Sequence, residues 1–181
     1  MRDTSAADRN APESIIHLFV TYYTDTQAQV VHVPDECYLG NGYSPVSSDV
    51  VRVSIPQVQD QPVAVKVLTF ERSAFLGRES PTVMYTFHVN GRFAAEAKLV
   101  TAIHNDPHCT HGYFSKVEVS FGSTEASPSP EKSVEAGKRV LQKILPVLVQ
   151  EHWPDWNELE GKSAPAGGRS LNQAASSSRG H

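Results

Sequence analysis

Much of the chain alternates apolar and polar residues with the two-residue period that is typical of β-strands. The segment 14–24 (SIIHLFVTYYT) is also rich in β-branched and aromatic side chains, and it predicts the first strand. Similar patterns predict further strands over residues 28–33, 50–55, 63–70, both arms of 83–103, and 113–121. Residues 34–48 (PDECYLGNGYSPVSS) contain two prolines and two glycines, and this composition indicates a loop.

The pair Asn90-Gly91 separates two apolar runs. Both residue types tolerate the positive φ that a type I′ turn requires, so the pair predicts a β-hairpin over residues 83–103. The second arm contains good helix formers at 96–98 (EAK), which makes a helix the competing interpretation there. Alternation of apolar residues over 93–103 favours the strand.

A helical period follows the polar linker 122–130. Ser129 is suited to the N-cap and Pro130 to the first helical position. Apolar residues then recur at helical spacing, namely Val134, Leu141, Ile144, Leu145, Leu148 and Trp153. We expect Pro146 to kink or divide this helix near Gln142, because proline lacks the N–H that would bond to that carbonyl.

Seven predicted strands followed by one long helix indicate an α+β fold. We expect a curved antiparallel sheet of about six or seven strands, with the amphipathic C-terminal helix packed across one face. Residues 14–160 form this single domain. Residues 1–13 and 161–181 contain almost nothing that could fill a core, and they predict a disordered arm and a disordered Gly/Ser/Ala-rich tail.

The 181 residues include 16 basic and 20 acidic ones, for a formal net charge of −4. This acidity argues against nucleic-acid binding, which depends on contacts between Lys or Arg and phosphates. Two cysteines, Cys37 and Cys109, are too few for a disulfide scaffold. The N-terminus does not resemble a secretory signal, and no apolar run is long enough to span a bilayer. We therefore expect a soluble cytoplasmic protein that binds neither nucleic acid nor membranes.

The residues best suited to bind a metal are clustered in one segment, His104, Asp106, His108, Cys109 and His111. Imidazole and thiolate are zinc ligands, and His104, His108, Cys109 and His111 are the candidate ligand set. The Asp-Pro pair at 106–107 indicates a loop, where helical His-x3-His geometry is lost. A solvated loop is therefore the favoured interpretation.

Acid–base candidates lie nearer the N-terminus. Asp25, Asp35 and Glu36 are carboxylates close to His32, and these side chain types are the ones most easily tuned toward neutral pH. Asp25 lies in a turn-like Thr-Asp-Thr, where a carboxylate more often caps local backbone. His88, like His17, interrupts an apolar strand and is interpreted as a strand histidine.

Two segments combine a turn containing Gly-Arg with a neighbouring strand, LGRES (76–80) and VNGRFAAE (89–96). Upstream, DTQAQVVH (25–32) is similar to the Asp-Thr-Asp-x-x-Gly-x-x-His stretch of thioesterases. With these motifs, residues 49–106 resemble the strand succession of hotdog-fold acyl-thioesterases and dehydratases.

The resemblance implies a hotdog-like sheet and an acyl-thioester hydrolase or dehydratase in which Asp25 and His32 are the acid–base pair. Gln27 stands where that family has its second, catalytic aspartate. Residues 34–48 stand where it has a long central helix.

The absence of a complete catalytic motif favours a non-catalytic binding or interaction protein without a cofactor. Its apolar sheet and helix would form a pocket or surface for a small apolar ligand or a partner protein, and a homo-oligomer is one form of such an interaction. Two alternatives stay open. One is the hotdog-type enzyme, and the other is a metal-dependent enzyme that uses the cluster at 104–111.

Overall fold

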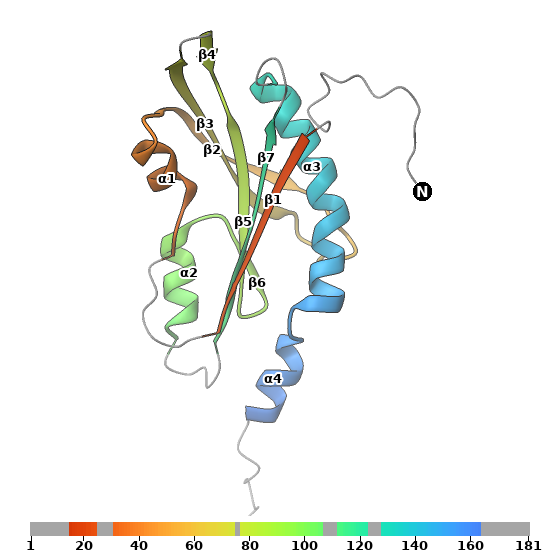
Figure 1. Cartoon of the computed structure of the whole chain (residues 1–181). Helices are drawn as coiled ribbons and strands as arrows, with labels where there is room; N and C mark the ends of the chain where they lie inside the picture. The colour runs from red at the N-terminus through yellow and green to blue at the C-terminus, as the bar shows by residue number, and fades with distance from the viewer. Residues whose placement is uncertain (1–14, 25–30, 75–76, 107–111, 123–127, 164–181) are drawn as a thin grey trace, which may run out of the picture.

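The computed structural model describes residues 15–24, 31–74, 77–106, 112–122 and 128–163 (Figure 1). The strands are β1 (Ile15–Tyr23), β2 (Ser44–Val53), β3 (Val63–Ala74), β4 (Gly77–Glu79), β5 (Thr82–Val89), β6 (Arg92–Ala94) and β7 (Phe114–Gly122). The helices are α1 (Pro34–Gly40), α2 (Ala97–His104), α3 (Pro130–Val147), a π-helical turn η2 (Leu148–His152) and α4 (Trp156–Ser163). The fold is α+β, as predicted.

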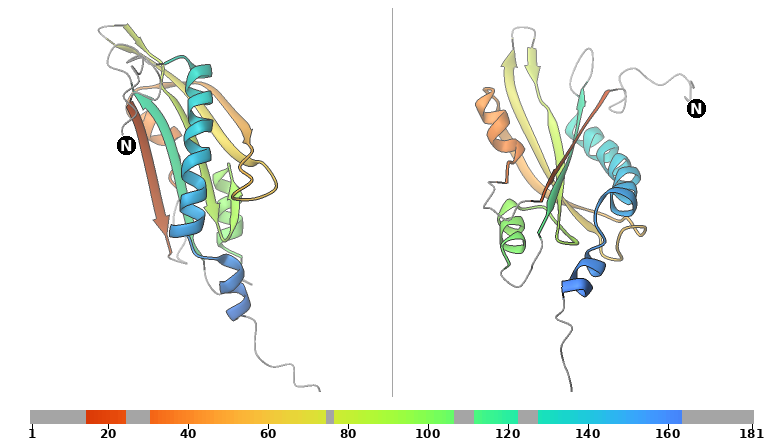
Figure 2. Two further views of the ribbon diagram at one scale, coloured as in Figure 1. Left: turned by 90° about the vertical axis from the view of Figure 1, so that its right-hand side faces the viewer. Right: turned by 60° about the horizontal axis from the view of Figure 1, so that its bottom comes forward.

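The seven strands form one open antiparallel sheet. Its main order is β1-β7-β5-β3-β2, while β4 pairs with β3 and β6 pairs with β5. Helix α3 crosses one face over β5 and β7, and α1 and α2 cover the other face (Figure 2). In the strand order given above, β1 and β2 are the two outer strands.

Each face of the sheet carries its own apolar core. The α3 face buries the first set, which includes Val65, Met84, Val117, Leu141 and Leu145. The opposite face buries the second set, which includes Leu68, Phe70, Phe87, Val100 and Phe114. Because both faces are covered, the central strand β5 is buried along its whole length.

The structure of α3 confirms where the C-terminal helix was predicted to begin and which of its faces was predicted to be apolar. The Ser129 hydroxyl accepts a hydrogen bond from the Lys132 amide at 3.4 Å, and Pro130 occupies the first turn. The prediction of a division near Gln142 is wrong, because α3 runs without interruption to Val147. Proline removes only its own N–H, and the neighbouring helical bonds and the packing of α3 on the sheet keep the helix continuous through Pro146.

The Asn90-Gly91 turn is confirmed. Both residues have positive φ, 45° and 74°, and they join β5 to β6. The second arm was predicted to stay extended to residue 103, and this is wrong. β6 ends at Ala94, and the competing helix forms as α2, which buries Val100 against the second core.

The loop predicted for residues 34–48 is also wrong. Pro34 starts α1, with acidic side chains in its first turn, and β2 already begins at Ser44. The Tyr38 ring stacks on Phe70 with centroids 4.5 Å apart, so the second core holds this short helix in place. Of the strand predicted over 28–33, residues 31–33 are not in a strand, and 28–30 lie outside the described residues.

Among the helices of the described residues, none is both long enough and apolar enough to cross a membrane.

Candidate functional site

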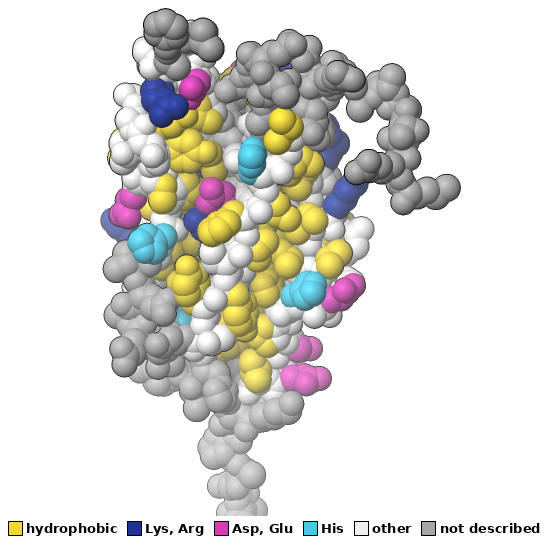
Figure 3. Space-filling model, viewed as in Figure 1, with side chains coloured by type: hydrophobic (Ala, Val, Ile, Leu, Met, Phe, Trp, Pro, Cys, Tyr) yellow, Lys and Arg dark blue, Asp and Glu magenta, His cyan; other side chains and the backbone are white. Residues whose placement is uncertain are grey.

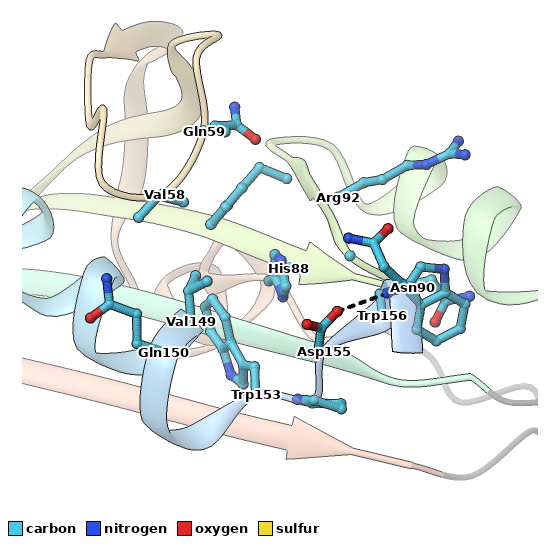
Figure 4. A pocket seen from close by; sticks show the side chains of 14 residues that line it. Val58, Gln59, His88, Asn90, Arg92, Val149, Gln150, Trp153, Asp155 and Trp156 are labelled. Carbon is cyan, nitrogen blue, oxygen red and sulfur yellow. Dashed lines mark hydrogen bonds between the residues drawn. The ribbon is translucent and has the colours of Figure 1, made fainter. Parts of the chain in front are cut away.

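A cleft lies between the β5–β6 hairpin and the chain that follows α3 (Figure 4). It has a volume of about 660 Å³. The loop after β2 closes one side. The lining residues are Val58, Gln59, His88, Asn90, Gly91, Arg92, Phe93, Val149, Gln150, Trp153, Pro154, Asp155, Trp156 and Asn157.

Asn90 fixes the hairpin that forms one wall of the cleft. Its side-chain carbonyl accepts from the Tyr113 amide at 2.9 Å, and its side-chain NH₂ donates to the Ile103 carbonyl at 3.2 Å. The Asn90 amide also donates to the Tyr113 carbonyl. Hydrogen bonds of Asn90 thus tie the turn to the end of α2 and to the residue just before β7.

Trp156 packs against the same hairpin. A Cβ atom on Gly91 would lie 2.7 Å from Cβ of Trp156, so only glycine allows this contact. Asp155 precedes Trp156 and accepts from the Asn157 amide at 3.0 Å, which caps the start of α4. The opposing wall is therefore also set by local hydrogen bonding.

His88 forms the buried floor of the cleft, with only 6% of its surface exposed. Its ring stacks on Trp153 with centroids 4.3 Å apart and lies 4.6 Å from the Phe93 ring. Burial lowers the pKa of His88 to about 4. The imidazole is therefore neutral at neutral pH.

The hydroxyl of Tyr113 lies 2.9 Å from Nδ1 of His88. Burial raises the pKa of Tyr113 to about 12, against the opposing effect of the Gly91 backbone amide, so the phenol keeps its proton. Which of the two groups donates depends on the imidazole tautomer, and in the tautomer that accepts the phenol proton at Nδ1 the imidazole carries its own hydrogen on Nε2. Within the described part of the chain, no side chain or backbone group bonds to Nε2.

The rim of the cleft is polar and carries both signs of charge. Arg92 and Asp155 are exposed, and Figure 4 shows Gln59 and Gln150 on two further segments around the opening. One cation and one carboxylate leave the rim without net charge. The cleft therefore combines an aromatic floor with amide groups around its mouth.

Of the acid–base residues predicted from the sequence, His32, Asp35 and Glu36 do not line this cleft. His32 is exposed just before α1, and Asp35 and Glu36 belong to the first turn of α1. Asp25 lies outside the described residues. The Asp25–His32 pair and the hotdog resemblance that implies it stay predictions.

The predicted metal cluster is described only in part. His104 ends α2 and contacts the Phe114 ring edge-on, while Asp106 is exposed. His108, Cys109 and His111 lie outside the described residues. Among the residues that are described, no group of three or more His, Cys, Asp or Glu could hold a metal ion. The zinc site of His104, His108, Cys109 and His111 stays a prediction.

Sequence reasoning interpreted His88 as an ordinary strand histidine and missed its place in the cleft. The local signal was a histidine on a mostly apolar strand, two positions before Asn-Gly. That signal does not reveal Tyr113 or Trp153, which are distant in sequence.

No protein-family model matches the chain, and neither a curated protein nor a solved structure shows significant similarity to it.

Proposed function

We propose that the protein is a non-catalytic binding protein whose cleft holds a small, uncharged, partly flat ligand. The observation that supports this proposal best is His88, a buried neutral imidazole at the floor of the cleft whose Nδ1 is engaged by Tyr113. In the tautomer whose Nδ1 accepts from Tyr113, Nε2–H is a donor that a ligand acceptor in the cleft can engage. The ligand therefore presents a carbonyl-type oxygen to Nε2.

The properties of His88 favour binding over catalysis. A general base works best with a pKa near the operating pH, whereas the pKa of His88 is about 4. Its Nδ1 is already engaged by Tyr113, so the pair acts as a fixed donor. The cleft volume of about 660 Å³ lies in the usual range for small-molecule sites.

The lining indicates the type of ligand. Phe93 and Trp156 offer aromatic edges and faces to a flat molecule, while Gln59 and Gln150 provide both donors and acceptors. Arg92 and Asp155 have opposite charges, so neither an anion nor a cation is favoured overall. An uncharged ligand with a ring and a carbonyl fits these features best.

Three probes that share a phenyl ring test this proposal, namely benzamide, benzoate and benzylamine. We expect benzamide to shift the NMR resonances of His88 and of the indoles of Trp153 and Trp156. Benzylamine lacks an acceptor oxygen and carries a positive charge, and benzoate carries a negative one. Both should bind more weakly than benzamide.

His88→Phe keeps a ring for stacking on Trp153 but removes the Nε2 donor. We expect it to weaken benzamide binding at least tenfold. His17→Phe changes an exposed histidine of β1 and is the matched control, which should bind benzamide normally. Equal binding by His88→Phe and the wild type, or an absence of shifts in the cleft, would contradict the proposal.

A further inference from the structure

β1 is an outer strand of the sheet whose side chains are exposed on both faces. Its one described neighbour is β7, so one edge of its backbone has no strand beside it within the described residues. Six of its nine residues are large, apolar and 37–57% exposed, namely Ile15, Ile16, Leu18, Phe19, Val20 and Tyr22. Figure 3 shows apolar side chains in a band over the region where Figure 1 places β1.

The other outer strand, β2, is protected in the ways that are usual for sheet edges. It contains Pro45, and its register shifts between Pro45 and Ser47. It also carries the charged residues Asp49 and Arg52. Proline, bulges and charges all oppose pairing with a further strand. β1 has no proline, no register shift and no Asp, Glu, Lys or Arg.

The two faces of β1 differ in character. Its pairing with β7 places Ile16, Leu18 and Val20 opposite Phe121, Val119 and Val117, on the α3 face. The three β7 residues belong to the first core, and the three β1 residues continue this apolar row to the edge of the sheet, where their side chains are exposed. On the opposite face, Phe19 lies under the Lys116 ammonium, 5.5 Å from its ring centroid. The strand that covers this edge must therefore be apolar on the α3 face.

Neither terminal segment of the chain has a sequence suited to such a strand. Residues 1–14 (MRDTSAADRNAPES) and 164–181 (APAGGRSLNQAASSSRGH) lack the alternating β-branched and aromatic residues that would match β1. β1 itself has the required pattern, and it has no formal charge that would oppose pairing with an identical strand. We propose that β1 pairs with β1 of a second copy and forms a two-fold symmetric dimer.

An antiparallel pair related by a two-fold axis perpendicular to the sheet keeps both α3 faces on the same side. With Phe19 at the axis, Ile16 lies opposite Tyr22 of the second copy, and Leu18 lies opposite Val20. The two sheets then join into one. The half-exposed side chains and the backbone edge bury on the order of 500 Å² per copy, or about 1,000 Å² in total, which is the size of a weak, reversible interface.

Sedimentation velocity over a concentration series tests the proposal. We expect the full-length wild type to show a monomer–dimer equilibrium. Val20→Lys places a charge in the apolar row and should weaken dimerisation at least tenfold. Val50→Lys makes the same change on β2, where the valine is 45% exposed against 40% for Val20, and it should leave the equilibrium unchanged.

Circular dichroism and thermal unfolding establish that each variant is folded, and Leu18→Lys replaces Val20→Lys if the latter is not. A wild type that stays monomeric at every concentration would overturn the proposal, and so would a dimer that tolerates lysine in the row. Equal loss of dimer in Val50→Lys would place the interface elsewhere and would overturn it as well. Benzamide binding does not enter these measurements, so they are independent of the proposed cleft.

Discussion

Gly137 of α3 lies directly against Met84 of β5. A Cβ atom at position 137 would overlap the sulfur of Met84, which is completely buried. The missing side chain lets the helix approach the sheet, and the methionine fills the space above it. The distance between α3 and the first core therefore depends on this glycine.

Gly137→Ala should destabilise the protein by up to about 2 kcal/mol, because an overpacking cost of about 1–3 kcal/mol is offset in part by a gain of about 1 kcal/mol in helix propensity. Urea unfolding measures the effect. Gly40→Ala is the matched control, since a Cβ atom at Gly40 in α1 would meet nothing within 4 Å. Adding Met84→Ala should make Gly137→Ala less costly than it is alone. A stabilising Gly137→Ala would contradict the contact.

Gly91→Ala should cost more than Gly42→Ala. Both glycines have positive φ, 74° and 80°, so each substitution strains the backbone by about 1 kcal/mol. Only position 91 also meets Trp156, at 2.7 Å, which should add roughly 1–3 kcal/mol. Thermal unfolding of the two variants compares them directly. Equal losses would mean that Trp156 moves away without cost.

Acid should destabilise the fold through His88. Its folded-state pKa of about 4 lies below the ordinary value of 6.5, so between these values the unfolded chain binds a proton that the folded chain does not. The free energy of unfolding therefore falls as the pH falls from about 6.5 to about 4, by about 3 kcal/mol from this group, and this contribution is constant above that range. In His88→Phe this part of the pH dependence should be lost. An unchanged pH profile in that variant would contradict the assignment.

Leu141→Ala and Leu148→Ala should differ, although both positions belong to the predicted apolar stripe. Leu141 is completely buried in the first core, so its truncation should cost about 2–5 kcal/mol. Leu148 begins the π-helical turn and is only partly buried, so its truncation should cost less. Chemical denaturation gives both values. Two small losses would mean that α3 does not pack on the sheet in solution.

The features that the sequence alone determined are those whose causes are local. The β-branched and aromatic residues of 14–24 predict β1, and the alternation in 113–121 predicts β7, because side-chain direction repeats every two residues in extended backbone. Asn90-Gly91 specifies its own turn, and Ser129 caps the helix that it precedes. The apolar stripe of α3 follows from the helical period. Each of these signals lies within a few neighbouring residues.

Tertiary structure decided the rest. The segment 34–40 is too short for a helical period to be visible, and its helix depends on Tyr38 stacking on Phe70. Residues 97–104 satisfy both a strand and a helix pattern, and packing of Val100 on the second core selects the helix.

The cleft shows most clearly the difference between what the sequence determined and what the tertiary structure decided. His88, Tyr113 and Trp153 are separated by 25 residues or more, and no local pattern relates them. The pairing of His88 with Ser115 brings Tyr113 to the imidazole, and the turn after α3 brings Trp153 onto its other side. Sequence therefore determined the elements, because their causes are local. The sheet register and helix packing determined the site, because its contacts exist only after distant segments have come together.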